Sequence, residues 1–140
     1  MKKCEQVNEF LWTVRVYYED TDAGGVVFYA NYLKFMERAR TEWLRSAGFQ
    51  QSRLAEEEGV VFAVRRVQLD FLRPARLDDR LDVSVQQVNR RRASMEIEQE
   101  VRRGREVLCR GKVEIVCVDA QRFRPHVIPD TILAEIAHGD

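Results

Sequence analysis

Residues 17–48 read YYEDTDAGGVVFYANYLKFMERARTEWLRSAG, and this stretch decides the fold. It begins with an acidic, glycine-containing loop, Glu19 to Gly25, and continues into a helix predicted over about Tyr32 to Ala47. The helix is predicted because apolar residues recur at the helical period and form one stripe: Tyr32, Phe35, Met36, Ala39, Trp43 and Ala47. Asn31 is a good N-cap, and Gly48 is a good residue to end the helix.

The position of the loop next to the helix start has chemical consequences. A helix of about 16 residues is roughly 24 Å long, which is enough to cross a small sheet. The backbone N–H groups of its first turn have no partner within the helix, so they can polarise a carbonyl group or bind an anion. The loop places carboxylates close to these groups.

Alternating apolar residues predict strands on both sides of this stretch. The predicted elements are strands at 11–18, 60–73, 81–85, 93–101 and 107–117, an extra helical turn at 53–58, a loop at 89–92 and a helix at 130–137. A change of phase at Arg65 and Arg66 predicts a β-bulge in the second strand. We therefore expect an α+β fold in which a five-stranded antiparallel sheet wraps around one long central helix. The open edges of such a sheet favour pairing with another subunit.

The register of the last two strands can be predicted from their charges. A hairpin centred on Gly104 pairs Ile97 with Gly111. The same register pairs Glu98 with Arg110 and Glu96 with Lys112, so opposite charges face each other. Cross-strand pairs of opposite charge stabilise a sheet, so both faces favour this register.

Length and charge limit the possible classes of function. The 140 residues suit a single domain, 1–140, and the net charge of zero provides no bulk basic field for nucleic acid or a membrane. No run approaches the roughly 18 apolar residues of a membrane-spanning helix, and residues 1–12 lack the apolar segment of a signal peptide. We expect a cytoplasmic protein with no integral membrane segment and no nucleic-acid partner.

Neither a disulfide nor a metal site is expected. Cys4, Cys109 and Cys117 form no C-x-x-C pair, and the last two would lie too far apart along one strand to be bridged. His126 and His138 both lie near the C-terminus, so no cluster with metal-ligand spacing is present in the sequence. Reduced, buried thiols are the expected state.

Two motifs together resemble a known family. The loop D-x-D-x-x-G at 20–25 is followed by A-N-Y at 30–32 and by E-R-A-R-T-E at 37–42. This combination resembles the Tol–Pal-associated acyl-CoA thioesterases, in the 4-hydroxybenzoyl-CoA thioesterase branch of the hotdog fold. The similarity extends over nearly the whole chain, including A-R-L-D-D at 75–79 and V-C-V-D at 116–119.

The resemblance implies hydrolysis of acyl-CoA, or of acyl-carrier-protein thioesters, by homodimers or tetramers with active sites between paired subunits. It implies no cofactor beyond the CoA of the substrate. The essential carboxylate of the family corresponds to Asp22, and a loop tyrosine corresponds to Tyr18. Close relatives often carry His where this chain has Tyr29; an aromatic residue there implies that the backbone N–H polarises the carbonyl.

Thioester hydrolysis needs an attacking group and a site for the oxyanion. Asp22 is the candidate general base or nucleophile, and the helix start from Tyr29 through Asn31 to Tyr32 is the candidate source of donors and substrate contacts. The simpler alternative is that Asp20 and Asp22 only cap turns, as Asx residues do. For Asp20 we favour that structural role, and Tyr18 either lines the acyl pocket or packs in the core.

Two further predictions concern substrate binding. Glu37 lies opposite the apolar stripe, so it is either solvated or buried by a partner subunit as a second carboxylate of the site. Arg90 and Arg91 belong to the densest basic run, which either binds the phosphates of CoA or a phosphopantetheine carrier or is a solvated loop.

Three functions are compatible with this fold. The first is the acyl-CoA thioesterase. The second is a hotdog dehydratase or hydratase, which needs a catalytic histidine, whereas His126 and His138 lie outside the motif. The third is a non-catalytic module that binds acyl-CoA or acyl-carrier protein and is linked to the cell-envelope Tol–Pal system. We favour the first. The length of the acyl chain does not follow from the sequence.

Overall fold

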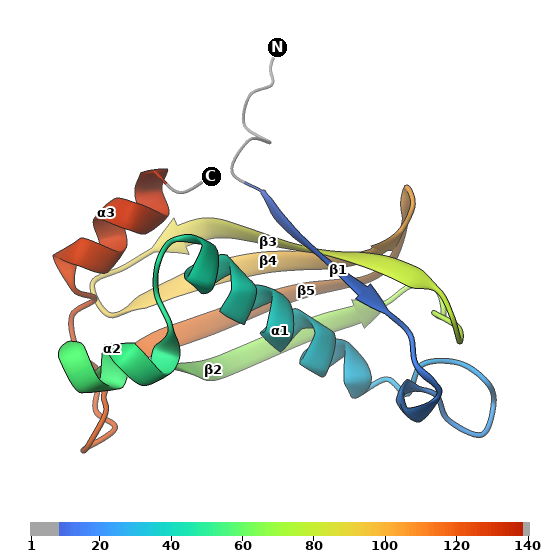
Figure 1. The fold of residues 1–140 in the computed structure, drawn as a ribbon, viewed down its shortest axis with the longest axis horizontal. Helices are drawn as coiled ribbons and strands as arrows, with labels where there is room; N and C mark the ends of the chain where they lie inside the picture. Colours follow the sequence, from blue (N-terminus) through green and yellow to red (C-terminus); the bar gives the residue numbers. More distant parts are fainter. Residues whose placement is uncertain (1–8, 139–140) are drawn as a thin grey trace, which may run out of the picture.

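The computed structural model describes residues 9–138, which form a five-stranded antiparallel sheet and three α-helices (Figure 1). The strands are β1 (Phe10–Arg15), β2 (Val60–Phe71), β3 (Arg80–Arg90), β4 (Ser94–Arg103) and β5 (Glu106–Asp119). The helices are α1 (Asn31–Ser46), α2 (Gln51–Glu57) and α3 (Asp130–His138), and a short 3-10 helix covers Tyr18–Asp20. The strand order is β1-β3-β4-β5-β2, so β1 and β2 are the outer strands. The predicted α+β class and five-stranded antiparallel sheet are confirmed.

Helix α1 lies along one face of the sheet (Figure 1) and buries the predicted apolar stripe except Ala47, which is the C-cap. Phe35, Met36 and Ala39 are almost completely inaccessible. Gly48 has a φ of 97°, which favours glycine, so it ends the helix as predicted. The prediction of Asn31 as the N-cap is wrong: Ala30 is the N-cap, and Asn31 is already helical because its side chain is bonded to Asp20 instead.

Strand β1 ends three residues earlier than predicted. Val16 donates its backbone N–H to the carbonyl oxygen of Asp79, and the Asp20 carboxylate then accepts a hydrogen bond from the backbone of Tyr17. These contacts turn the chain into the 3-10 helix, so Tyr17 and Tyr18 do not continue the strand. The predicted bulge in β2 is confirmed by a shift of register between Val64 and Arg66.

The predicted register of the β4–β5 hairpin is wrong by two residues. Ile97 pairs with Val113, and Gln99 pairs with Gly111. The difference of two residues has two causes of one residue each. The turn closes on the pair Arg103 and Glu106, and the register shifts again between Val101 and Arg102. Opposite charges still face each other in the observed register, as Glu98–Lys112 and Glu100–Arg110.

The predicted loop at 89–92 begins two residues too early. Asn89 and Arg90 belong to the end of β3, where they pair with Glu96 and Met95, and the chain bends only after them. Among the cysteines, Cys109 and Cys117 are buried and free, whereas Cys4 lies outside the described residues.

Candidate functional site

The acidic loop between β1 and α1 forms a small hairpin. Asp22 donates its N–H to the carbonyl oxygen of Val26 over 2.9 Å, and Phe28 donates to the carbonyl oxygen of Asp20 over 2.9 Å. A β-bridge joins Thr21 to Val27 between these bonds. The hairpin therefore fixes the backbone of Asp22 relative to the residues that lead into α1.

The carboxylate of Asp22 is exposed at the tip of this hairpin. Its Oδ1 atom accepts a hydrogen bond of 2.8 Å from the backbone N–H of Gly24, so Asp22 does cap a turn. Within residues 9–138, no group donates a hydrogen bond to its Oδ2 atom. One oxygen thus orients the carboxylate, and the other is available to a water molecule or a substrate.

Asp20 has a different environment from Asp22. It is buried, and its two oxygens accept hydrogen bonds from the side-chain amide of Asn31 and from the backbone of Tyr17, over 2.8 and 2.9 Å. The predicted structural role of Asp20 fits these contacts. Asn31, a predicted substrate contact, therefore holds the loop in place through its bond to Asp20.

The segment that enters α1 presents two backbone donors. The N–H groups of Asn31, Tyr32 and Leu33 donate to carbonyl oxygens three residues earlier. In contrast, the N–H groups of Tyr29 and Ala30 have no acceptor within the described chain. Unpaired donors at the start of a helix are suited to an oxyanion or a polarised carbonyl.

Aromatic side chains of this segment contact one another and Phe71. The ring of Tyr29 is 64% exposed and meets Phe71 edge to face, with ring centroids 6.1 Å apart. Tyr32 is buried against the same Phe71, and its hydroxyl oxygen accepts a hydrogen bond from the backbone of Ala75. Burial raises the pKa of Tyr32. Tyr18 is 81% exposed, so within one chain it does not pack in the core.

The remaining predicted residues lie elsewhere in one chain. Glu37 is exposed on α1, where its Oε2 atom accepts a hydrogen bond from the hydroxyl of Thr41. Arg90 and Arg91 lie at the end of β3 that is opposite to the start of α1 (Figure 1). An 11-residue strand is about 35 Å long, so these arginines are remote from Asp22 in the same chain.

A polar pair that joins α1 to β4, Arg40 and Gln99, was not predicted from the sequence. The guanidinium of Arg40 donates to the Oε1 atom of Gln99 over 2.8 Å, and Gln99 is completely inaccessible. The amide nitrogen of Gln99 donates to the carbonyl oxygens of Met36 and Ser84, over 3.1 and 3.2 Å. The signal was present in the sequence, because Gln99 occupies an apolar position in the alternation of β4.

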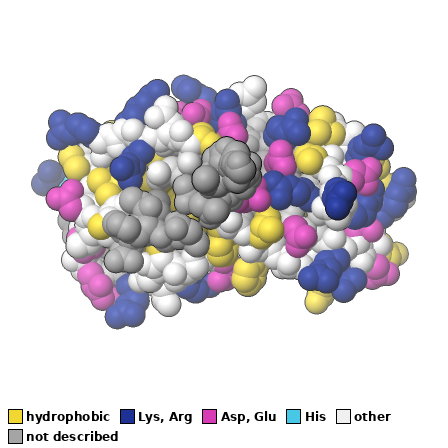
Figure 2. All heavy atoms as spheres, turned by 90° about the horizontal axis from the view of Figure 1, so that it is seen from above, with side chains coloured by type: hydrophobic (Ala, Val, Ile, Leu, Met, Phe, Trp, Pro, Cys, Tyr) yellow, Lys and Arg dark blue, Asp and Glu magenta, His cyan; other side chains and the backbone are white. Residues whose placement is uncertain are grey.

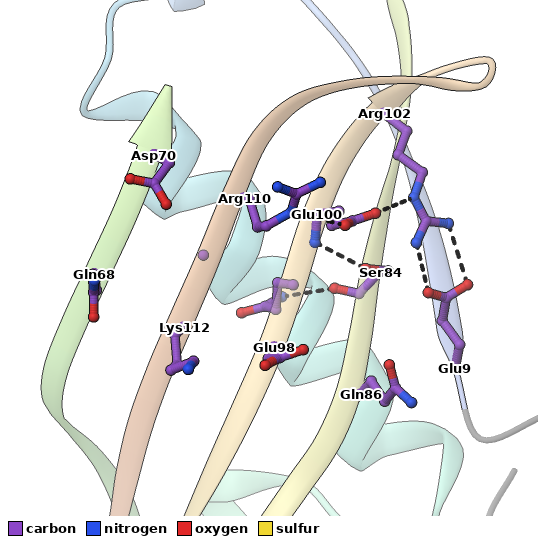
Figure 3. A pocket seen from close by; sticks show the side chains of 12 residues that line it. Glu9, Gln68, Asp70, Ser84, Gln86, Glu98, Glu100, Arg102, Arg110 and Lys112 are labelled. Atoms are coloured by element: carbon purple, nitrogen blue, oxygen red, sulfur yellow. Dashed lines mark hydrogen bonds and ion pairs between the residues drawn. The ribbon is translucent and has the colours of Figure 1, made fainter. Parts of the chain in front are cut away.

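A cavity of about 300 Å³ lies on the face of the sheet that is turned away from α1 (Figure 3). Four of the seven charged residues that line it are paired with one another. Arg102 binds Glu9 at 2.6 Å and Glu100 at 2.8 Å, and Arg110 binds Glu100 at 3.1 Å. None of the predicted site residues lines this cavity. We therefore assign it no part in the chemistry of the loop.

The surface and composition of the described chain restrict other classes of site. On the face seen in Figure 2, basic and acidic side chains of described residues are interspersed rather than gathered by sign. Residues 9–138 contain no group of three His, Cys, Asp or Glu residues that could hold a metal ion. No helix in this range is long and apolar enough to cross a membrane.

Known proteins share both the sequence and this fold. Residues 24–110 match the thioesterase superfamily. The chain is 42% identical over 131 residues to the acyl-CoA thioesterase YbgC of Haemophilus influenzae, covering 94% of this chain and 96% of that protein. It is 44% identical over 127 residues to the acyl-CoA thioester hydrolase YbgC of Escherichia coli O6:H1, covering 90% and 94%. A probable thioesterase from Bartonella henselae superposes with a TM-score of 0.83 at 36% identity, covering 86% of this chain and 99% of that chain.

Proposed function

Because the chain belongs to the thioesterase superfamily and is an acyl-CoA thioester hydrolase of the hotdog fold, we propose that Asp22 delivers the attack on the thioester. The observation that carries this proposal is the pair of unpaired N–H groups at Tyr29 and Ala30, next to a hairpin that fixes Asp22. These amides hold the carbonyl oxygen of the substrate, and they stabilise the negative charge that develops on it.

Two routes are compatible with this arrangement. In the first, Asp22 accepts a proton from water, the resulting hydroxide attacks the carbonyl carbon, and the carbon–sulfur bond breaks with release of CoA as a thiol. In the second, the Asp22 carboxylate attacks directly, CoA leaves, and water then hydrolyses the mixed anhydride. The free Oδ2 atom serves either route, because the bond from Gly24 occupies only Oδ1.

We propose that the active site is completed by a second copy of the chain. Strand β2 is an outer strand of 12 residues, and Val64, Val67 and Phe71 on it are exposed. Antiparallel pairing of two such edges about a two-fold axis brings the end of one β2 next to the beginning of the other. Phe71, and with it Tyr29, would then face the partner subunit, which covers the exposed hairpin of Asp22.

The cellular setting is also part of the proposal. We place the single domain of 1–140 in the cytoplasm, where buried thiols such as Cys109 stay reduced. In a dimer, Arg90 and Arg91 of one subunit lie toward the α1 start of the other, where they contact phosphates of CoA or of an acyl-carrier protein. A link to the Tol–Pal system is an alternative setting in which the chain only binds acyl groups.

Hydrolysis of an acyl-CoA panel tests the proposal, with release of free thiol as the readout. We expect Asp22→Asn to lower kcat by about 10²–10⁴-fold, the usual contribution of a positioned acid–base group. Glu19→Gln is the matched control, because Glu19 is an exposed carboxylate of the same loop. Equal rates for wild type and Asp22→Asn would remove Asp22 from the mechanism.

Two further measurements separate the alternatives. In a single turnover in ¹⁸O-labelled water, the base route labels only the acid product, so isotope in Asp22 would show the nucleophilic route with water attacking the Asp22 carbonyl of the mixed anhydride. Tight binding of acyl-CoA without turnover, even at high enzyme concentration, would instead favour the non-catalytic module.

A further inference from the structure

A second cavity, of about 260 Å³, lies between α1 and the outer strand β2. Most of its wall is apolar, but two charged side chains of α1 also line it. The lining residues are Glu37, Arg40, Thr41, Trp43, Leu44, Gln51, Phe62, Val64 and Ile115. An apolar cavity with a few fixed polar groups is the usual form of a small-ligand site.

Arg40 is held rigidly in this wall. One guanidinium nitrogen, Nη1, donates to Gln99, which the backbone oxygens of Met36 and Ser84 fix in turn. Arg40 forms no ion pair with any residue of the described chain. Burial lowers its pKa, against the opposing effect of the Glu37 charge. Several N–H donors of a fixed arginine are thus left for a ligand, because a guanidinium carries five.

Glu37 supplies the complementary acceptor. Its Oε2 atom is bonded to Thr41 over 2.9 Å, and its other oxygen has no partner among residues 9–138. The cavity therefore offers both a cationic donor and an anionic acceptor between apolar walls. A hydroxyl group can accept from Arg40 and donate to Glu37, whereas a carboxylate would be repelled by Glu37 and a methyl group can bond to neither.

The cavity lies further along α1 than the amides of Tyr29 and Ala30, which are proposed to bind the carbonyl oxygen. Ten residues separate Ala30 from Arg40, which corresponds to about 15 Å of helix. Resting on the proposed function above, we propose that this cavity receives the far end of the acyl group and that Arg40 and Glu37 select acyl chains that end in a hydroxyl group. These two residues determine specificity and take no part in bond breaking.

Straight-chain acyl-CoA substrates of increasing length, each with its ω-hydroxy counterpart, test this inference. At the chain length that reaches the cavity, we expect kcat/KM for the hydroxylated substrate to exceed that of the plain one by about tenfold or more, because the site bonds the hydroxyl group. Arg40→Met should remove this ratio and Glu37→Gln should reduce it, whereas Arg45→Met, at an exposed arginine of the same helix, should leave it unchanged.

A variant of the inner strand β5 keeps the test valid if Arg40→Met fails to fold. Ile115 lines the cavity, so Ile115→Phe should fill part of it, lower kcat/KM for long chains and spare short ones. A ratio near one at every chain length in the wild type would overturn the inference while leaving the thioesterase assignment intact. Loss of turnover for the whole panel in the wild type would instead contradict the proposed function.

Discussion

The side-chain amide of Asn31 donates a hydrogen bond of 2.8 Å to the Oδ1 atom of Asp20, so the first residue of α1 is tied to the hairpin that carries Asp22. Both residues are buried. Asp20 also bonds the backbone of Tyr17, where the chain leaves β1. One carboxylate therefore joins the three segments that meet at the proposed active site.

The first prediction concerns this bond. Asn31→Ala leaves a buried carboxylate oxygen without its donor, so it should lower the free energy of unfolding by about 1–3 kcal/mol. It should also lower kcat, because the hairpin loses its attachment to α1. Urea unfolding and steady-state kinetics measure both effects. Lys34→Ala, at an exposed residue of the same helix, is the control, and an unchanged kcat in Asn31→Ala would show that the bond does not position Asp22.

The second prediction concerns Gly24, whose backbone holds the Asp22 carboxylate. A Cβ atom at this position would lie 3.3 Å from Oδ1 of Asp22, which is closer than an ordinary contact. Gly24→Ala should therefore displace the carboxylate and lower kcat by about tenfold, since small misplacements of reacting groups are costly.

Thermal unfolding should change little in this variant, because the backbone φ of Gly24 does not require glycine. Ala23→Ser, at the exposed neighbouring position, is the control for a change in the loop that leaves the carboxylate in place. Wild-type kinetics in Gly24→Ala would mean that the observed orientation of Asp22 is not the catalytic one.

Local patterns predicted most of the fold, because each element has a strong one. The apolar stripe of α1, the stop at Gly48 and the bulge in β2 were all found. The hairpin register was not, since charges on the outer face suit two registers that differ by two residues. Only the centre of the turn and the shift beyond Val101 choose between them. Gly104 marked the turn without setting its centre, and the shift has no clear sequence signal.

The candidate site was predicted less completely, because it depends on contacts between distant segments. The motif nominated Asp22 and Tyr29, whose roles stay predictions, but the loop alone did not show that Asn31 holds Asp20. Arg40 and Gln99 are 59 positions apart, so only the folded chain brings them together. Roles that need a second subunit, such as those of Tyr18 and Arg90, stay predictions.

The third prediction concerns the approach of α1 to the sheet at Gly111. A Cβ atom there would lie 2.8 Å from the side chain of Leu69 and 3.0 Å from that of Met36. Gly111→Ala should lower the free energy of unfolding by about 1–3 kcal/mol, the usual cost of overpacking a core. Denaturant unfolding measures this change, with Lys112→Ala at the exposed neighbour as the control. A stability equal to that of the wild type would show that α1 lies further from β5 than described.

The fourth prediction concerns stability at alkaline pH. Burial raises the pKa of Cys109 to about 12 and that of Cys117 to about 11. Because these pKa values are higher in the folded than in the unfolded chain, the stability due to neutral thiols is complete below pH of about 8.5 and is lost as the pH rises above it. At a pH of about 10, each thiol should cost about 2 kcal/mol of stability relative to neutral pH.

Urea unfolding of the wild type and of a Cys109→Ala/Cys117→Ala variant at both pH values measures this loss. The two substitutions lower the free energy of unfolding at every pH, because they leave cavities in the core. The comparison therefore uses the change in the free energy of unfolding between the two pH values. The wild type should lose more stability than the variant between the two pH values. Equal losses would show that the thiols ionise as readily in the folded chain as in the unfolded chain. Rapid labelling of native Cys109 by a thiol reagent at neutral pH would contradict its burial directly.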